Sequence, residues 1–292
     1  FSLNLIPLLI CIPSSILVAL LMYFLKLPRW FGPADTIFAA HNRAGTLDVK
    51  GGFGSTLASF ISISGGASVG IYGPLVHFGG TISAFIRKFS FVPKIPHDII
   101  IGSGVAAAIS AGFGAPLAGI IFAHEIVLRH FSMKAITALA VASMAANFSA
   151  SEINLINSSL LLTPVPFKFS DIIGSISLIG PIAAVVAIIF MRAMIYLGTI
   201  PKKINIKLWQ APIIAGICCG LFGLLFDEVL GIGTDTLMLI ITSEQSYQYL
   251  LLLLVGKLLL TSICIGFGFF GGTYSPALFL GAIVGALVFQ LP

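Results

Sequence analysis

Long apolar runs alternate with short polar connectors along most of this chain. Runs of about 18 apolar residues or more are the usual sign of a helix that crosses a bilayer. Six runs reach or approach that length: Leu3–Leu25, His97–Phe122, Ala135–Ala146, Ile172–Leu197, Ala211–Leu225 and Tyr249–Leu291. The pattern therefore predicts an all-α protein whose helices cross or enter a membrane.

Composition strengthens this prediction. Of the 292 residues, 58% are hydrophobic and only 9% are charged, and the mean hydropathy is +1.10. A soluble domain of this size has no core large enough to bury so much apolar surface. Lys and Arg residues sit mostly in short connectors, which is typical of loops at a membrane surface and not of a nucleic-acid patch. We expect a multi-pass integral membrane protein with the lipid bilayer as its partner and no nucleic acid.

The residue types that carry enzyme chemistry do not form recognisable patterns. The four cysteines, Cys11, Cys218, Cys219 and Cys264, all lie in apolar runs, where cysteine behaves as a small hydrophobic residue. Their spacing does not resemble a metal site, and the sequence shows neither a nucleophile motif nor a nucleotide-binding loop. We expect no enzyme activity, no cofactor and no metal.

Two glycine-rich breaks interrupt the apolar runs at corresponding places. The segment Gly51–Ser64 stops at Gly65-Gly66, and a new helix begins near Gly73 with Pro74 in its first turn. In the later part, Leu250–Gly266 leads to a second break with the same order of features. That break reads Gly271-Gly272-Thr273-Tyr274-Ser275-Pro276, and an apolar helix follows. Two broken segments in matching positions indicate inverted repeats with a binding site near the middle of the membrane.

Such breaks suit an anion. A helix N-terminus carries unpaired N–H groups and about half an elementary positive charge, so two of them aimed at one point stabilise a negative ion. Partial charges also release the ion again, which permeation requires. The alternative is that the breaks only kink helices for packing.

The connector from Pro164 to Lys168 precedes the long run Asp171–Leu197 and is interpreted as the hinge between two halves. We expect residues 1–165 to form the first membrane half and residues 166–292 a partial second half of a single membrane domain. The chain starts without methionine and ends inside an apolar run, so we expect terminal helices to be missing from both halves.

Three segments together resemble the CLC chloride channel and transporter family. Gly70-Ile71-Tyr72-Gly73-Pro74, followed by Val76-His77, resembles the family's Gly-Arg/Lys-Glu-Gly-Pro-x-Val-His segment, and Gly271–Pro276 resembles its Gly-Gly-Ile-Phe-x-Pro segment. Ala106–Glu125 is similar to the alanine-rich helix pair between them. The resemblance implies a CLC-like inverted-repeat bundle of tilted and broken helices. It also implies chloride or a similar small anion as the substrate, a homodimer, and a place in the plasma (inner) membrane.

The resemblance also implies which residues line the anion pathway. They are Ile71, Tyr72, Gly73, Pro74, Gly272, Thr273, Tyr274, Ser275 and Pro276, together with Phe31 and Gly32 in a segment that matches the family less well.

Two positions depart from the family in a way that bears on proton coupling. Tyr72 stands where the family has a glutamate that gates the pathway and carries the proton, and a phenol with a pKa of about 10 stays neutral at neutral pH. Ile126 stands at the second proton-transfer glutamate, whereas Glu125 is interpreted as structural. Tyr72 is then a gate that carries no exchangeable proton, and we expect passive, proton-uncoupled chloride conduction.

Two alternatives remain at the sequence level. One is a chloride/proton exchanger that uses another residue as its proton carrier, and the other is a non-conducting structural or regulatory membrane subunit. Lys257, deep in an apolar run, is expected to form a structural ion pair or to snorkel towards the interface. His77 is expected to be a hydrogen-bonded packing residue and not a ligand.

Overall fold

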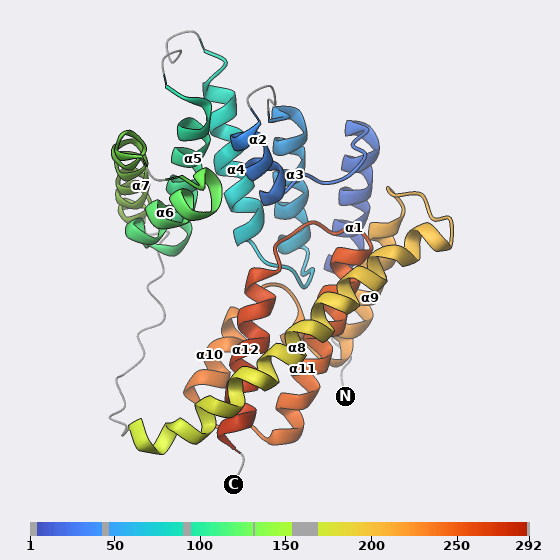
Figure 1. Cartoon of the computed structure of the whole chain (residues 1–292). Helices are drawn as coiled ribbons and strands as arrows, with labels where there is room; N and C mark the ends of the chain where they lie inside the picture. The colour runs from blue at the N-terminus through green and yellow to red at the C-terminus, as the bar shows by residue number, and fades with distance from the viewer. Residues whose placement is uncertain (1–4, 43–46, 90–94, 131, 154–168, 291–292) are drawn as a thin grey trace. The chain divides into compact units, whose positions relative to one another are not determined.

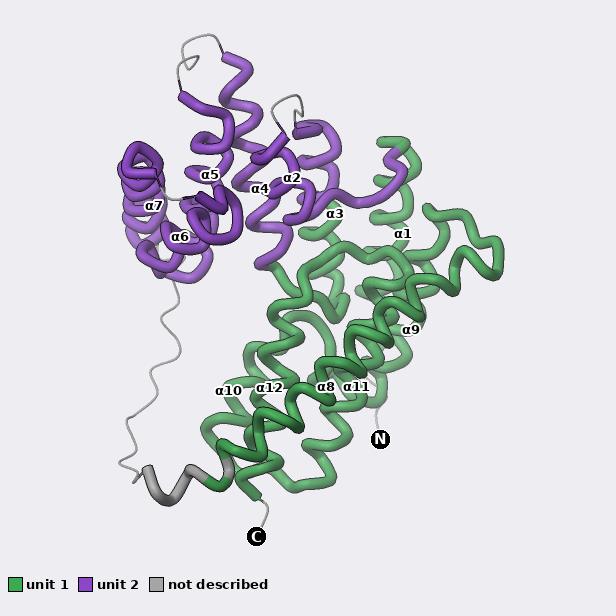
Figure 2. The backbone as a smooth tube through the Cα atoms, viewed as in Figure 1, with its two compact units in different colours: residues 1–26, 58–71, 160–292 green, residues 27–57, 72–159 purple. Residues whose placement is uncertain are grey.

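A computed structural model describes residues 5–42, 47–89, 95–130, 132–153 and 169–290. Within these residues the regular structure is helical, with twelve α-helices, one π-helix and one short 3₁₀-helix. The chain forms two compact units that interleave along the sequence (Figure 2). Unit 1 comprises Phe1–Lys26, Ala58–Ile71 and Leu160–Pro292, and unit 2 comprises Leu27–Leu57 and Tyr72–Ser159. The predicted all-α class is confirmed.

Unit 1 contains most of the long helices. They are α1 (Ile6–Leu25), α8 (Phe169–Lys203), α9 (Ala211–Leu225), α10 (Thr234–Thr242), α11 (Tyr247–Gly266) and α12 (Tyr274–Phe289), with the 3₁₀-helix Asp227–Val229 before α10. Helix α1 packs along α9. A Cβ atom added to Gly216 of α9 would lie 2.3 Å from Cβ of Ser15, so the glycine lets the two helices approach closely.

Helix α8 crosses α11 and α12 within unit 1 (Figure 1). At the crossing with α11, a Cβ atom on Gly266 would lie only 2.9 Å from the backbone nitrogen of Gly198. Small residues therefore set the spacing of this pair too. Side chains on the other faces of α8 remain exposed, as Ile195 does with 71% of its surface.

Unit 2 is built from shorter helices. They are α2 (Pro33–His41), α4 (Tyr72–Ile86), α5 (His97–Phe113), α6 (Pro116–Phe122), the π-helix Ala123–Leu128 and α7 (Met133–Glu152), while α3 (Val49–Ser64) begins in unit 2 and ends in unit 1. Helices α4 and α5 cross where Gly79 faces Gly104, since a Cβ atom on Gly79 would lie 2.3 Å from the Gly104 carbonyl oxygen.

The break between α5 and α6 follows from local chemistry. Gly114 adopts a left-handed conformation (φ +64°) that ends α5, and Pro116 starts α6. Two serines then tie three helices together. Ser110 Oγ donates to the Ser143 carbonyl at 2.7 Å, and Ser143 Oγ donates to the Pro116 carbonyl at 2.8 Å.

Four helices of the described residues are long and apolar enough to cross a membrane. These are Ile6–Leu25, Met133–Glu152, Ile176–Lys203 and Tyr247–Gly266. The predicted runs His97–Phe122 and Tyr249–Leu291 are each two helices in the structure, because glycine and proline interrupt the hydrogen-bond ladder inside them. The predicted run Ala211–Leu225 is confirmed as α9 with the same bounds.

The predicted hinge at Pro164–Lys168 lies outside the described residues. The division into residues 1–165 and 166–292 therefore stays a prediction.

Candidate functional site

The two glycine-rich breaks pair with each other inside unit 1. Gly70 N–H donates to the Gly272 carbonyl at 2.7 Å, and Gly272 N–H donates to the Gly70 carbonyl at 2.6 Å, forming an antiparallel bridge. The bridge needs glycine. A Cβ atom on Gly70 would lie 2.7 Å from Ser275 Oγ, and one on Gly271 would lie 2.3 Å from Cγ2 of Val69. The two breaks, which correspond in sequence, thus also contact each other through their backbones.

The second break leads into α12. Thr273 precedes the helix and is exposed, Tyr274 is half-exposed, and Ser275 is buried. The Ser275 Oγ atom has no hydrogen-bond partner among the described atoms. The first amides of a helix have no acceptor within that helix, so this turn offers donors of the kind that hold an anion.

The first break leads into α4, which belongs to unit 2. Tyr72 begins α4 and stacks on Phe113 of α5, with ring centroids 3.8 Å apart and planes inclined by 15°. Behind it, Leu75 fills the space beside Gly112, where a Cβ atom would lie 2.3 Å from the leucine side chain. The tyrosine ring is therefore fixed against the C-terminal end of α5. Its role as a gate stays a prediction.

The third predicted segment lies at the start of α2. Phe31 N–H donates to Ser55 Oγ at 2.8 Å, and Gly32 N–H donates to the Asp35 carboxylate at 2.8 Å. Both amides thus donate to protein side chains in this structure. An anion contact at Phe31 and Gly32 stays a prediction.

Asp35 also forms an ion pair with Arg29 at the surface of unit 2. The guanidinium donates to both carboxylate oxygens, and Nη1 lies 2.9 Å from Oδ2. Partial burial acts to raise the pKa of Asp35, but the hydrogen bonds from Arg29 and from Gly32 N–H outweigh it, so that pKa lies below its usual value. Asp35 is therefore ionised at neutral pH.

His77 of α4 is fully buried in unit 2. Its Nδ1 atom shares a hydrogen bond with Thr36 Oγ1 of α2 at 2.7 Å, and its carbonyl accepts from Thr81 Oγ1 at 2.7 Å. The Nε2 atom has no hydrogen-bond partner among the described atoms. His77 is hydrogen-bonded, as expected, but on one side of the ring only.

Lys257 of α11 is fully buried and differs from the expectation. Its Nζ donates to the carbonyls of Val229 at 3.1 Å and Gly231 at 2.8 Å, and it lies 5.0 Å from the centroid of the Phe279 ring. Among the described side chains it makes no ion pair, and it does not snorkel. Val229 ends the short 3₁₀-helix and Gly231 follows it, so two backbone carbonyls take the place of the expected carboxylate.

The loop that accepts hydrogen bonds from Lys257 also contacts the first break. Gly231 N–H donates to the Gly66 carbonyl at 3.0 Å, so the loop that Lys257 holds is bonded to the turn after α3. Sequence reasoning missed this connection because the charged group and its acceptors lie 26 and 28 residues apart.

Ile126 lies in the π-helix Ala123–Leu128 of unit 2 and is 37% exposed. A hydrocarbon side chain transfers no proton, so Ile126 cannot take the place of the family's second proton-transfer glutamate. Within the parts of the chain that the structure describes, His, Cys, Asp and Glu side chains do not gather in threes at a place suited to a metal ion.

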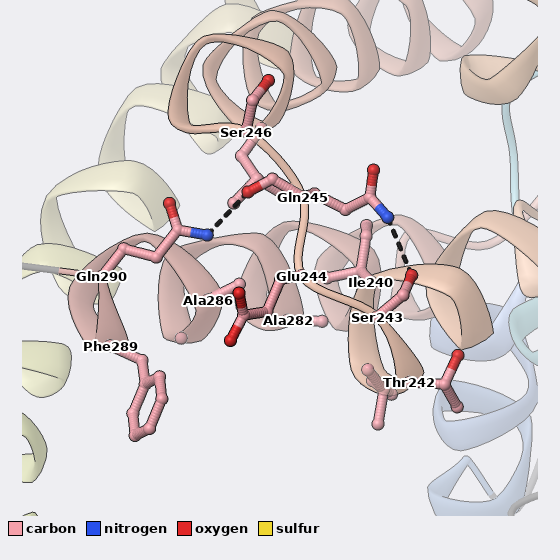
Figure 3. Close-up of a pocket in the computed structure, with 13 residues that line it drawn as sticks. Ile240, Thr242, Ser243, Glu244, Gln245, Ser246, Ala282, Ala286, Phe289 and Gln290 are labelled. Carbon is pink, nitrogen blue, oxygen red and sulfur yellow. Dashed lines mark hydrogen bonds between the residues drawn. The ribbon is translucent and has the colours of Figure 1, made fainter.

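A cavity of about 1070 Å³ lies in unit 1 between the α10–α11 connection and the C-terminal end of α12 (Figure 3). Gln290 Nε2 donates to the Gln245 carbonyl at 2.7 Å, and Gln245 Nε2 donates to Ser243 Oγ at 2.8 Å along its rim. None of the predicted pathway residues lines this cavity.

Known proteins resemble this chain over most of its length. The sequence profile of the family described as "Voltage gated chloride channel" matches residues 14–292. The "H(+)/Cl(-) exchange transporter ClcA" of Vibrio cholerae is 28% identical over 236 residues, which cover 77% of this chain and 49% of that protein. The chain thus spans about half the length of the curated relatives it matches.

Solved structures show the same fold. A slow cyanobacterial Cl⁻/H⁺ antiporter superposes with a TM-score of 0.78 at 21% identity, covering 97% of this chain and 68% of the other. A CLC-type fluoride/proton antiporter gives a TM-score of 0.71 at 22% identity, covering 100% and 82%. The predicted CLC-like bundle is confirmed.

These comparisons correct the prediction of passive, proton-uncoupled conduction, which is wrong. The curated relative is named as an exchanger, and both solved structures are antiporters. The error has a physical source. Tyr72 and Ile126 show only that these two side chains carry no proton, and they do not exclude a carrier elsewhere.

Proposed function

Because the chain belongs to the voltage-gated chloride channel (CLC) family, we propose that it is a membrane transporter that exchanges chloride for protons. The relatives named as H⁺/Cl⁻ exchange transporters support exchange as the activity. It replaces passive conduction with a coupled cycle in which anion and proton move in opposite directions. We place the protein in the plasma membrane as a homodimer, in line with the bacterial relatives.

The observation that supports an anion site is the bridge between the two breaks. The Gly70–Gly272 hydrogen bonds hold together two segments that each precede a helix start by two residues. Helix starts provide amide donors and a partial positive charge, which bind an anion without a full countercharge. We therefore assign chloride binding to Gly272, Thr273, Tyr274 and Ser275 of the second break, and a pathway role of the first-break residues Ile71–Pro74 stays a separate prediction.

Thr273 and Ser275 distinguish this site from one made of amides alone. Their hydroxyl groups are additional donors beside the start of α12, and Ser275 Oγ is buried and has no protein partner in the described structure. A halide accepts hydrogen bonds readily, so a buried hydroxyl without a partner gains most from a bound anion.

The first prediction tests the exchange itself. The protein is reconstituted into liposomes, an outward chloride gradient is imposed, and proton movement is followed with a pH electrode. We expect chloride efflux to drive proton uptake, and the reversal potential to depend on both gradients. Protein-free liposomes treated in the same way are the control.

Two results would contradict the proposal. A reversal potential set by chloride alone, at every pH gradient, would show that anion flux is not coupled to protons. Absence of any halide flux from liposomes that contain correctly inserted protein would favour the non-conducting subunit instead.

A further inference from the structure

Exchange requires a group that takes up and releases a proton inside the protein, and the two expected positions do not provide one. Tyr72 is a phenol with a reference pKa of about 10, and Ile126 is a hydrocarbon. Ionisable side chains within a membrane are rare, and His is among those that form proton relays there. The carrier must then be one of the other buried ionisable groups.

Lys257 is the first such group, and its contacts argue against it. The ammonium group donates to two carbonyls and faces the Phe279 ring. Release of the proton would forfeit the cation–π attraction and weaken both charge-assisted hydrogen bonds. Each of these contacts favours the charged form of the lysine over the neutral form.

His77 has the opposite arrangement. Nδ1 is bound to Thr36 Oγ1, which fixes the ring, whereas Nε2 is buried without a hydrogen-bond partner in the described structure. A buried polar atom without a hydrogen bond destabilises a protein, so its presence calls for an explanation. With hydrogen on Nδ1, the Nε2 atom carries a lone pair that is open to a proton.

Polar residues follow one another from the exposed Arg29–Asp35 pair to Thr36, which is bonded to His77 Nδ1. Arg29 and Asp35 form the outer end, with 59% and 19% of their side-chain surfaces exposed. Thr36 follows Asp35 in the same turn of α2 and is fully buried. Gly80 of α4 leaves room for it, since a Cβ atom there would lie 2.5 Å from Thr36 Cγ2. The polar row is thus Asp35, Thr36 and His77.

We propose that His77 is the residue that carries the exchanged proton, with Thr36 holding its ring and Asp35 at the solvent end of the polar row. This inference rests on the proposed exchange function. In each cycle Nε2 takes up one proton, which makes the ring an imidazolium with one positive charge. The ring returns to the neutral form when Nε2 releases this proton after its access changes to the opposite side of the membrane, while Nδ1 stays bonded to Thr36.

The surroundings suit a proton that is held only briefly. Burial disfavours the charged ring most strongly and the positive charge of Arg29 adds to this effect, so that together they outweigh the favourable influence of Asp35 and of the Gly32 backbone. The ring is therefore neutral at rest, and a proton that it takes up during transport is readily released.

The second prediction uses His77→Asn. The asparagine amide can replace Nδ1 in the bond to Thr36 but binds no proton at neutral pH. In liposomes we expect proton flux to fall on the order of 100-fold or more, the scale of a lost proton-transfer group, while chloride flux persists. The reversal potential should then follow chloride alone. Lys257→Met is the matched variant at the other buried ionisable side chain, and in folded protein it should keep the coupling.

The outcomes separate this inference from the proposed function. If the wild-type protein shows no coupling, the exchange proposal fails. If the wild type is coupled and His77→Asn remains equally coupled, His77 is not the carrier. Loss of coupling in Lys257→Met with coupling kept in His77→Asn would assign the role to the lysine.

A second variant covers the case in which His77→Asn does not fold. Thr36→Val removes the hydroxyl partner and leaves the imidazole in place. We expect coupling to persist with a shifted pH midpoint of transport, because the imidazole loses its hydrogen-bond partner at Nδ1. Thr36→Ser, which keeps the hydroxyl, should restore the wild-type midpoint. An unchanged midpoint in Thr36→Val would overturn the inference.

Discussion

At the scale of a single residue, Tyr72 controls how easily an anion passes if its ring is the gate. The ring is fixed by stacking on Phe113 at 3.8 Å. A stacked aromatic pair contributes about 0.5–1.5 kcal/mol beyond its buried area, so removing it eases opening by up to roughly tenfold. We therefore predict that Tyr72→Ala raises chloride flux, measured as initial efflux from liposomes.

Tyr72→Phe is the matched control for this third prediction. It keeps the ring and the stacking but removes the hydroxyl, so chloride flux and proton coupling should both stay near the wild-type values. Flux in Tyr72→Ala that equals the wild-type flux would show that the ring does not obstruct the pathway.

At the scale of the elements, the bridge between the two breaks is the feature that orders the start of α12. Gly70→Ala would place a Cβ atom 2.7 Å from Ser275 Oγ and 3.0 Å from the Gly272 carbonyl oxygen, so the bridge must open. Displacing a binding group by about 1 Å can lower a rate on the order of 100-fold. Our fourth prediction is a large loss of chloride flux with helix content unchanged by circular dichroism.

Gly281→Ala provides the comparison on α12. A Cβ atom there meets nothing within 4 Å among the described atoms, and alanine in a helix interior is more stable than glycine by about 0.5–1 kcal/mol. Transport should be retained and thermal stability should be equal or slightly higher. Equal flux in Gly70→Ala and Gly281→Ala would mean that the bridge does not position the site.

At the scale of the whole molecule, exposed apolar side chains on the long helices require lipid around them. Ile189 lies near the middle of the candidate span Ile176–Lys203 and is 51% exposed. An arginine at the centre of a spanning helix costs about 2.5–3.5 kcal/mol on insertion. The fifth prediction is that Ile189→Arg lowers the fraction of protein retained in membranes after an alkaline wash.

Lys202→Met, at the exposed C-terminal end of the same helix, is the control and should leave retention unchanged. Full retention of Ile189→Arg would show that this face of α8 does not contact lipid.

The elements could be predicted where the signals are local. Gly65-Gly66 and Gly271-Gly272 mark breaks because glycine and proline act on the backbone within a few residues, and Ala211–Leu225 was predicted with its observed bounds. The π-helix Ala123–Leu128 gave no such signal, since its residues are ordinary helix formers. Passive conduction was predicted wrongly because the argument considered only the two positions that the family resemblance supplied.

The contacts of the buried polar groups could not be predicted in the same way. His77 and Thr36 are 41 residues apart, and Lys257 binds carbonyls in a loop that precedes it by more than 25 residues. A sequence pattern shows that such groups must find partners in an apolar interior, but it does not show which partners are within reach.

An all-α membrane protein with two matching breaks could be predicted from the order of residues alone, because hydropathy and the effects of glycine and proline act over adjacent residues. The pairing of Gly70 with Gly272, the hydrogen bonds of Lys257 to backbone carbonyls and the bond between His77 and Thr36 appear only in the folded chain. The physical reason is that hydrogen bonds between distant segments depend on how the helices pack, and packing brings together residues that no local pattern relates.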